Sequence, residues 1–483
     1  MSKSIFRKKS VASLIAQADG SDGGHMLKRS LGAWNLTSLG VGGIIGAGIF
    51  VMTGQAAANY AGPAIILSFV LAGICCAFAA LCYAELASMI PVSGSAYSYA
   101  YASLGEVFAW IMGWLLLLEY GVSAATVATG WGGYLTSFIG DFGIVLPDAL
   151  TVSTLQVVDA GKETSHWIMG ASFNVPAFLG VWICTILLLF GVKESANANN
   201  IIVVIKVSVI LLFIVFGLSH VNMDNFSPFI PENQGGDKYG YDGVLRAAGV
   251  IFFAYIGFEA VSTAAQEAKN PKRDVPIGIL GSLVICTIIY MIVAFVLIGI
   301  VPYSTLNVPD PIAVGVDAIG MPWLAFLVKI GAIAGLSSVM LVMLYAQTRV
   351  FFTMSKDGLI PPVFSKIHPK YQTPWLNTLI LGTLISLVAG FTPISILGVL
   401  VSIGVLTAFA IICFSVFYLR IKQPDMVRPF SVPLPKITPL LGIACCLYLI
   451  YGLSDVLVTL KFYFLIGLVI YFAYGRKRSK LNA

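Results

Sequence analysis

The amino-acid sequence predicts an all-α, polytopic membrane protein with twelve transmembrane helices. Of the 483 residues, 58% are hydrophobic and only 10% are charged, whereas soluble proteins carry about 25% charged residues. Apolar runs long enough to cross a bilayer recur along the whole chain. Lysine and arginine concentrate in alternate connections between these runs, as they do in membrane proteins of fixed orientation.

The apolar runs give the domain organisation. We expect spans at residues 34–58, 63–89, 106–138, 174–192, 199–219, 243–266, 276–301, 323–354, 376–391, 394–419, 437–454 and 461–475. Residues 34–220 and 243–420 each hold five of these spans, and residues 437–475 hold the last two. Residues 1–33 and 476–483 are the two tails.

The basic residues orient the chain. When both termini are assigned to the cytoplasm, the inner segments carry 22 lysine and arginine residues, the outer segments carry four, and two lie within spans. Cytoplasmic loops of membrane proteins show this excess, so we expect both termini to be cytoplasmic. The asymmetry also explains the net charge of +6. Because no basic patch with interleaved aromatic residues is present, no nucleic-acid partner is expected.

The first span contains a glycine-rich segment, residues 42–50, in which four of nine residues are glycine. Each glycine inside a helix costs about 1 kcal/mol relative to alanine, so we expect the helix to break there. In hydrocarbon, a broken helix is tolerated where its backbone is buried in protein or lines a cavity. The segment therefore predicts a binding site made of backbone. The alternative is that Gly46 and Gly48 only allow close helix packing.

The sixth span contains a matching interruption. Residues 252–259 are rich in aromatic side chains and hold a glycine and an acid at mid-span. Two interrupted helices at corresponding places in two five-helix halves indicate the substrate site of a secondary transporter. We therefore expect a 5+5 inverted repeat with broken helices 1 and 6.

Two lysines lie within spans, where an ionisable residue is a candidate functional group. Lys206 lies about two turns from the inner end of the fifth span. A lysine held away from water can take up and release a proton during a transport cycle, and the alternative is that it reaches the cytoplasmic interface. Lys329, in the outer third of the eighth span, is expected to reach the outer interface.

Two acids and two serines complete the candidates. Glu119 is near the middle of the third span and is expected to relay protons or line the cavity, or else to form a structural hydrogen bond to a broken helix. Glu259 follows the break in helix 6, where it either caps freed backbone amides or accepts a proton. Ser337 and Ser338 face the first broken helix, where they hold Na⁺ or accept a hydrogen bond from Lys206.

No pattern in the sequence predicts catalysis, a metal site or a cofactor. The eight cysteines fall in apolar runs, and the four histidines lie in the tail, in loops or at a helix end. Without a nucleophile, a set of metal ligands or paired acids in the inner loops, a membrane enzyme is disfavoured; without rings of like charge or a filter motif, so is a channel. Residues 139–173 and 220–242 are expected to be outer loops, and residues 90–97 a short inner helix or re-entrant turn.

Several motifs together resemble one family. They are GVGGIIGAGIF at residues 40–50, GPA at 62–64, YAE at 83–85, PVSGSAY at 91–97, FFAYIGFE at 252–259, EAKNP at 267–271, QTR at 347–349 and SKDGLIP at 355–361. In order and spacing they resemble the amino acid–polyamine–organocation superfamily, and most closely the bacterial members of its cationic amino acid transporter branch. The resemblance covers about residues 27–480.

This resemblance implies the 5+5 inverted-repeat fold, alternating access and a site at the two breaks. The carboxylate of the substrate would bind the backbone amides of Ile44, Gly46, Ala47 and Gly48. Its amine would bind carbonyls of Phe253, Ala254 and Ile256. Helix direction agrees, because the outer half of helix 1 presents its N-terminal amides to an anion, and the outer half of helix 6 presents carbonyls to a cation.

The resemblance also implies how transport is driven. Proton-coupled members carry a lysine in helix 5 where sodium-coupled relatives bind Na⁺, and Lys206 matches that position. Ala47 stands where relatives often carry a hydroxyl residue, so one contact to the carboxylate is missing here. Met343 is expected at the floor of the pocket, where it favours neutral amino acids over arginine.

The sequence therefore predicts a proton-coupled symporter of small to medium neutral L-amino acids in the bacterial plasma (inner) membrane. The alternatives are a sodium-coupled symporter, an amino acid exchanger and a carrier of cationic amino acids. The expected partners are an amino acid, a proton and the lipid bilayer, and a small membrane subunit is left open.

Overall fold

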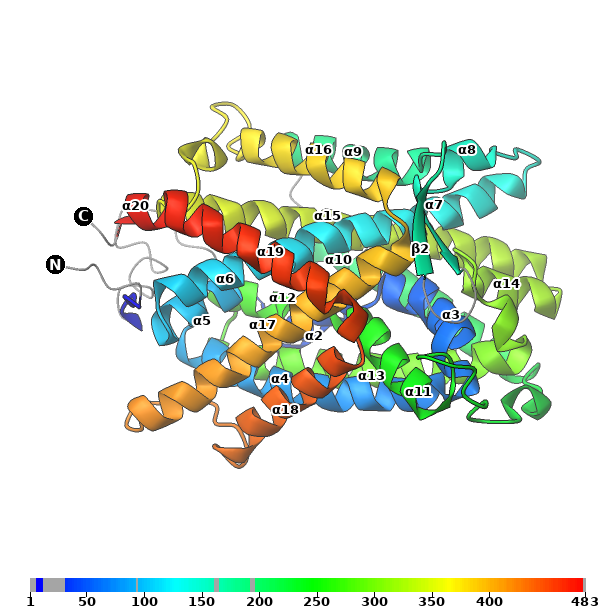
Figure 1. Ribbon diagram of the computed structural model, residues 1–483, viewed down its shortest axis with the longest axis horizontal. Coiled ribbons are helices and arrows are strands. Elements are labelled where there is room, and N and C mark those ends of the chain that lie inside the picture. The colour runs from blue at the N-terminus through cyan, green and yellow to red at the C-terminus, as the bar shows by residue number, and fades with distance from the viewer. Residues whose placement is uncertain (1–5, 12–30, 93, 160–164, 192–195, 481–483) are drawn as a thin grey trace.

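The computed structural model describes residues 6–11, 31–92, 94–159, 165–191 and 196–480. Most of the long helices run along one axis of the molecule (Figure 1). Helices α5 (Ser95–Ser103), α6 (Glu106–Leu116) and α20 (Arg476–Arg478) lie at one end of this axis, and α8 (Asp148–Thr151) and α14 (Pro311–Ile319) lie at the opposite end.

In the described residues of the first half, the main elements are helices and one β-hairpin. They are α2 (Ala33–Ile44), α3 (Thr53–Ala56), α4 (Ile65–Met89), α5 (Ser95–Ser103), α6 (Glu106–Leu116), α7 (Ser123–Gly140), α8 (Asp148–Thr151), β1 (Leu155–Asp159), β2 (Ser165–Met169), α9 (Val175–Leu189) and α10 (Ala196–Leu218). Helix α5 occupies part of the inner stretch that was expected to hold a short helix or a turn.

The second half is helical throughout its main elements. They are α11 (Gly240–Ile251), α12 (Ala260–Thr263), α13 (Pro271–Ile300), α14 (Pro311–Ile319), α15 (Pro322–Lys356), α16 (Trp375–Phe391), α17 (Ile394–Lys422), α18 (Ile437–Tyr451), α19 (Leu457–Ile470) and α20 (Arg476–Arg478). Between α14 and the long α15 the chain turns at Gly320, which adopts a left-handed conformation.

Within the described residues, eight helical segments are long and apolar enough to cross a membrane, and three apolar helices are shorter. Large apolar side chains on the outside of the bundle remain exposed, among them Val204, Ile288, Leu384, Leu447 and Phe462. In water such a surface would be unfavourable, whereas in a bilayer it contacts lipid. The chain is thus a multi-pass membrane protein.

Two features differ from the expected boundaries. The third span is not one regular helix, because a π-helical segment, Leu117–Val122, separates α6 from α7. The outer loop at residues 139–173 contains the antiparallel hairpin of β1 and β2, which pairs Leu155 with Met169. The loop was expected to be plain surface, and its apolar alternation is too short to predict strands.

Helix α2 packs against α10 and α13, and α11 packs against α4 and α17. Helix α13 packs against both α2 and α4, and α15 packs against α7, α9 and α10. Helix α17 contacts α4, α7 and α11. The glycine-rich end of α2 is therefore surrounded by protein, as an interrupted helix in a membrane must be.

Candidate functional site

The first helix breaks where the glycines predict it. Helix α2 ends at Ile44, and Ile45 is extended, with φ −72° and ψ 98°. The helix resumes at Gly48 with a π-helical turn that ends at Met52. At such a break the last carbonyls of one half and the first amides of the other have no partner within the helix. The break therefore exposes both kinds of backbone group.

The sixth span breaks at a matching place. Helix α11 ends at Ile251, and a 3₁₀ turn, Phe252–Tyr255, follows it. Ile256 is extended, and Gly257 has a φ of +121°, a conformation that only glycine adopts without strain. The chain becomes helical again at Ala260.

The two breaks lie directly against each other. A Cβ atom added at Gly48 would lie 2.3 Å from the Cα of Ala254, and one added at Gly257 would lie 2.5 Å from the carbonyl carbon of Gly43. Gly48 is therefore needed for close packing as well as for the break. Backbone meets backbone at both contacts, so the peptide groups of the two helices can face one small space.

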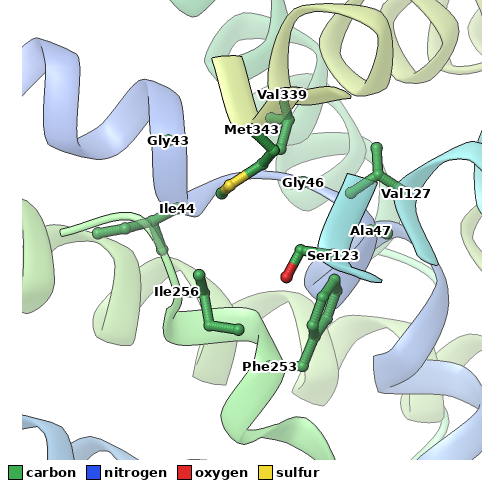
Figure 2. Close-up of a pocket in the computed structure, with 11 residues that line it drawn as sticks. Gly43, Ile44, Gly46, Ala47, Ser123, Val127, Phe253, Ile256, Val339 and Met343 are labelled. Carbon is green, nitrogen blue, oxygen red and sulfur yellow. The ribbon is translucent and has the colours of Figure 1, made fainter. Parts of the chain in front are cut away.

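A cavity occupies the space between the breaks (Figure 2). It is lined by Gly43, Ile44, Gly46, Ala47, Gly48, Ser123, Val127, Phe253, Ile256, Val339 and Met343. Its volume open to water-sized molecules is about 10 Å³, close to the minimum for a single water. An amino acid therefore enters only when the walls move apart.

All residues expected at the substrate lie in this lining except Ala254. Ala254 instead packs against Gly48, and its carbonyl accepts a hydrogen bond of 3.1 Å from the Tyr290 hydroxyl. We therefore correct its assignment: Ala254 lies behind the wall of the cavity and joins the two breaks to α13. Tyr290 also donates to the carbonyl of Ile44, at 2.7 Å.

The sequence reasoning missed four lining residues, namely Gly43, Ser123, Val127 and Val339. Val339 lies one helical turn before Met343, so the period of the helix was a signal that could have found it. Gly43 belongs to the glycine run that was recognised. Ser123 and Val127 follow the π-helical segment, which no pattern in the sequence predicts.

Lys206 lies against the broken end of α2. Its side chain is fully buried, and its Nζ donates hydrogen bonds to the carbonyls of Gly42 and Ile45, the latter at 3.0 Å. Its aliphatic part packs on α15 at Gly335. Lys206 does not reach the cytoplasmic interface, so the snorkelling alternative is wrong.

The two mid-span acids have different surroundings. Both oxygens of Glu259 accept hydrogen bonds from the amide of Gly257, at 2.9 and 3.1 Å. Glu259 thus caps an amide that the helix 6 break sets free. Glu119 is fully buried beside Glu259, with which it interacts electrostatically. Glu119 does not line the cavity.

The remaining candidates lie on α15. The hydroxyl of Ser337 donates to the carbonyl of Ile333 in its own helix, at 2.8 Å, and Ser338 is buried on the same turn. Neither serine lines the cavity. Lys329 is only 3% exposed and forms an ion pair with Asp141 at the end of α7, with both distances 2.8 Å. It therefore ends at an outer acid and not in open solvent.

The backbone groups at the two breaks suit the binding of a zwitterion. Amides at Gly48, where the helix after α2 begins, favour an anion, and carbonyls at the end of α11 favour a cation. Among the described residues, no group of three or more histidine, cysteine, aspartate or glutamate residues is placed to hold a metal ion.

Comparison with known proteins identifies one family. The sequence profile of the family described as "Amino acid permease" matches residues 31–473. A branched-chain amino acid permease of Bacillus subtilis is 47% identical over the full length of both chains. A methylthioribose transporter of the same bacterium is 44% identical over 99% of each chain. The vacuolar cationic amino acid transporter 4 of Arabidopsis thaliana is 39% identical over 88% of this chain and 68% of its own.

Proposed function

The chain belongs to the amino acid permease family of the amino acid–polyamine–organocation superfamily, and we propose that it is a proton-coupled symporter of small to medium neutral L-amino acids. Membership makes it a multi-pass membrane transporter of amino acids and not an enzyme. We propose the substrate, the coupling ion and the residues that bind each of them.

The proposed topology is twelve crossings in a 5+5 inverted repeat, with two further helices and both termini in the cytoplasm of a bacterium. The positive-inside distribution supports the orientation. The interruptions after α2 and α11, five spans apart, support the repeat. The two bacterial relatives align with the chain from end to end, which supports the bacterial plasma membrane as its location.

In the proposed complex, the backbone binds the atoms that all amino acids share. The α-carboxylate binds the amides of Gly46, Ala47 and Gly48, where the outer half of helix 1 begins. The α-ammonium binds the carbonyls of Phe253 and Ile256, next to the end of α11. Because Ala254 does not line the cavity, its carbonyl is left out of this proposed site.

The walls of the cavity support a neutral substrate. None of its lining residues is acidic or basic, so a guanidinium or a second ammonium would lie in an apolar environment without a counter-charge. Met343, which is 3% exposed, fills the side opposite Ser123 (Figure 2). A relative's name, branched-chain amino acid permease, favours the same class, whereas the plant relatives named cationic amino acid transporters favour the alternative.

The observation that carries proton coupling is the contact of Lys206 with the end of α2. An ammonium donates to several carbonyls at once, and a neutral amine holds them more weakly. Protonation of Lys206 would therefore fasten α10 to the inner half of helix 1, and loss of the proton would release it. Binding and release of one proton would thus favour different arrangements of the two helices.

The test is uptake into proteoliposomes with an imposed pH gradient and no sodium. We expect the wild type to accumulate a neutral amino acid such as alanine in response to the gradient. Lys206→Ala should lose at least about 90% of this response, because the buried cation is absent. Lys461→Ala, which removes an exposed lysine from α19, should transport like the wild type.

The outcomes separate the alternatives. An unchanged pH response in Lys206→Ala would contradict the coupling role of the lysine. Uptake that requires sodium would favour the sodium-coupled symporter. Uptake that requires amino acid inside the vesicles would favour the exchanger, and stronger competition by arginine than by alanine would favour the carrier of cationic amino acids.

A further inference from the structure

Ser123 is the one residue with a polar side chain in the lining of the cavity. It begins α7, directly after the π-helical segment, and is 1% exposed. Within the described part of the chain, its hydroxyl has no hydrogen-bond partner. Figure 2 shows the hydroxyl oxygen directed into the space between Met343, Ile256 and Phe253.

An unpaired serine hydroxyl is unusual in a helix. A helical serine or threonine commonly donates to a carbonyl three or four residues earlier, as Thr126 does to Val122 at 2.8 Å and Ser386 does to Thr383 at 2.8 Å. Buried hydroxyls without a partner are unfavourable. The position of Ser123 at the end of a π-helical turn is also typical of functional sites. A ligand group is therefore the natural partner for this hydroxyl.

The position of Ser123 along α7 indicates which part of a ligand it meets. Further along the same helix, a Cβ atom added at Gly130 would lie 3.6 Å from Ala47, so that part of α7 flanks the expected carboxylate site. Ser123 precedes Gly130 by two helical turns, about 10 Å at 1.5 Å per residue. In Figure 2, Val127 is beside Ala47 and Ser123 is nearer Phe253. Ser123 thus faces the side chain of a bound amino acid.

We propose that Ser123 is a specificity-determining residue that forms a hydrogen bond with a hydroxyl group on the substrate's own side chain. The inference rests on the proposed function, since it assumes that backbone groups hold the α-carboxylate and α-ammonium. Around this hydroxyl the cavity is apolar, with Val127, Val339 and Met343 in its wall. The site therefore accepts a side chain that is apolar in part and carries one hydroxyl near the Cα atom, as threonine and serine do.

Threonine and valine provide the sharpest probe, because they have nearly the same shape and differ by a hydroxyl in place of a methyl group. We compare the concentration of each that half-saturates thermal stabilisation of the purified protein, which needs no ion gradient. Ser123→Ala should reduce the preference for threonine over valine about tenfold, because a site that pairs a substrate hydroxyl discriminates against the isostere that lacks it. Serine and alanine should show the same direction of change.

The matched control is Ser386→Ala, which removes an equally buried serine hydroxyl that bonds only within α16. It should leave the threonine-to-valine ratio unchanged. Ser123→Ala itself should unfold at the temperature of the wild type or above, because it removes a buried hydroxyl that has no partner. This separates the role in recognition from a structural one.

Two results would overturn this inference alone. One is a threonine-to-valine ratio that is the same in Ser123→Ala and the wild type. The other is an equal loss of affinity for both amino acids, which would mean that Ser123 binds the shared carboxylate. A failure of proton coupling would appear only in the gradient experiment and would leave the ratio intact. If neither amino acid stabilises the wild type, both the proposed substrate class and the inference fail.

Discussion

Glu259 is a buried acid whose carboxylate accepts hydrogen bonds from a backbone amide. The break in helix 6 leaves the amide of Gly257 without a helical acceptor, and the two oxygens of Glu259 supply one. The side chain is fully buried, so water cannot take its place. Of the two roles considered for this residue, the geometry favours the cap, because its carboxylate is already held by the chain.

A pair of substitutions at Glu259 tests this role. Glu259→Ala leaves the Gly257 amide buried and unpaired, which should lower the free energy of unfolding by about 1–3 kcal/mol. Glu259→Gln keeps an acceptor oxygen and should lose less than half as much, with uptake largely retained. Thermal unfolding and uptake at constant pH measure both effects. Equal damage in the two variants would show that the negative charge, and not the acceptor, is what the protein needs.

At the scale of elements, the sequence predicted the breaks after α2 and α11 better than it predicted the residues that line the cavity between them. Four glycines in residues 42–50 and the glycine in residues 252–259 are local signals, and the chain does leave the helical conformation at both. The π-helical segment before Ser123 has no comparable local signal in the sequence. Ala254 does lie at the break in helix 6, as expected, but it is not among the residues that line the cavity.

Gly48 offers a test of the contact between the two broken helices. A Cβ atom there would lie 2.3 Å from the Cα and 2.4 Å from the Cβ of Ala254, so Gly48→Ala must push the helices apart. Overpacking of this kind costs about 1–3 kcal/mol. We expect a lower unfolding temperature and at least about a tenfold loss of uptake.

The control for this variant is Gly140→Ala, at the end of α7. A Cβ atom at Gly140 would meet nothing within 4 Å, and alanine is the better helix former. This variant should match the wild type in unfolding temperature and uptake. Full uptake by Gly48→Ala would mean that the helices separate without harm, and that their close contact is not needed for the site.

At the scale of the whole molecule, ion pairs join different helices at the two ends of the bundle. At the end assigned to the cytoplasm, Glu85 of α4 binds Arg420 of α17 and the amide of Val432. At the other end, Lys329 of α15 binds Asp141 at the end of α7. The cavity is lined by residues of neither ion pair, and its volume open to water-sized molecules is about 10 Å³. An alternating-access cycle would need each of the two ends to open in turn.

The outer pair should therefore hold the outer path closed. In Asp141→Asn the buried Lys329 loses the carboxylate that it contacts at 2.8 Å, while the half-exposed position 141 still tolerates the amide. Pairs of this exposure contribute roughly 0.2–1 kcal/mol, so the open population should rise about 1.4- to fivefold. The measurement is the rate at which a membrane-impermeant thiol reagent labels a Val127→Cys variant in intact cells.

The control is Asp148→Asn, at an exposed acid of α8 near the same end, which should leave the labelling rate unchanged. An equal rate in both variants would contradict the role of the pair, and labelling only after permeabilisation would reverse the proposed orientation.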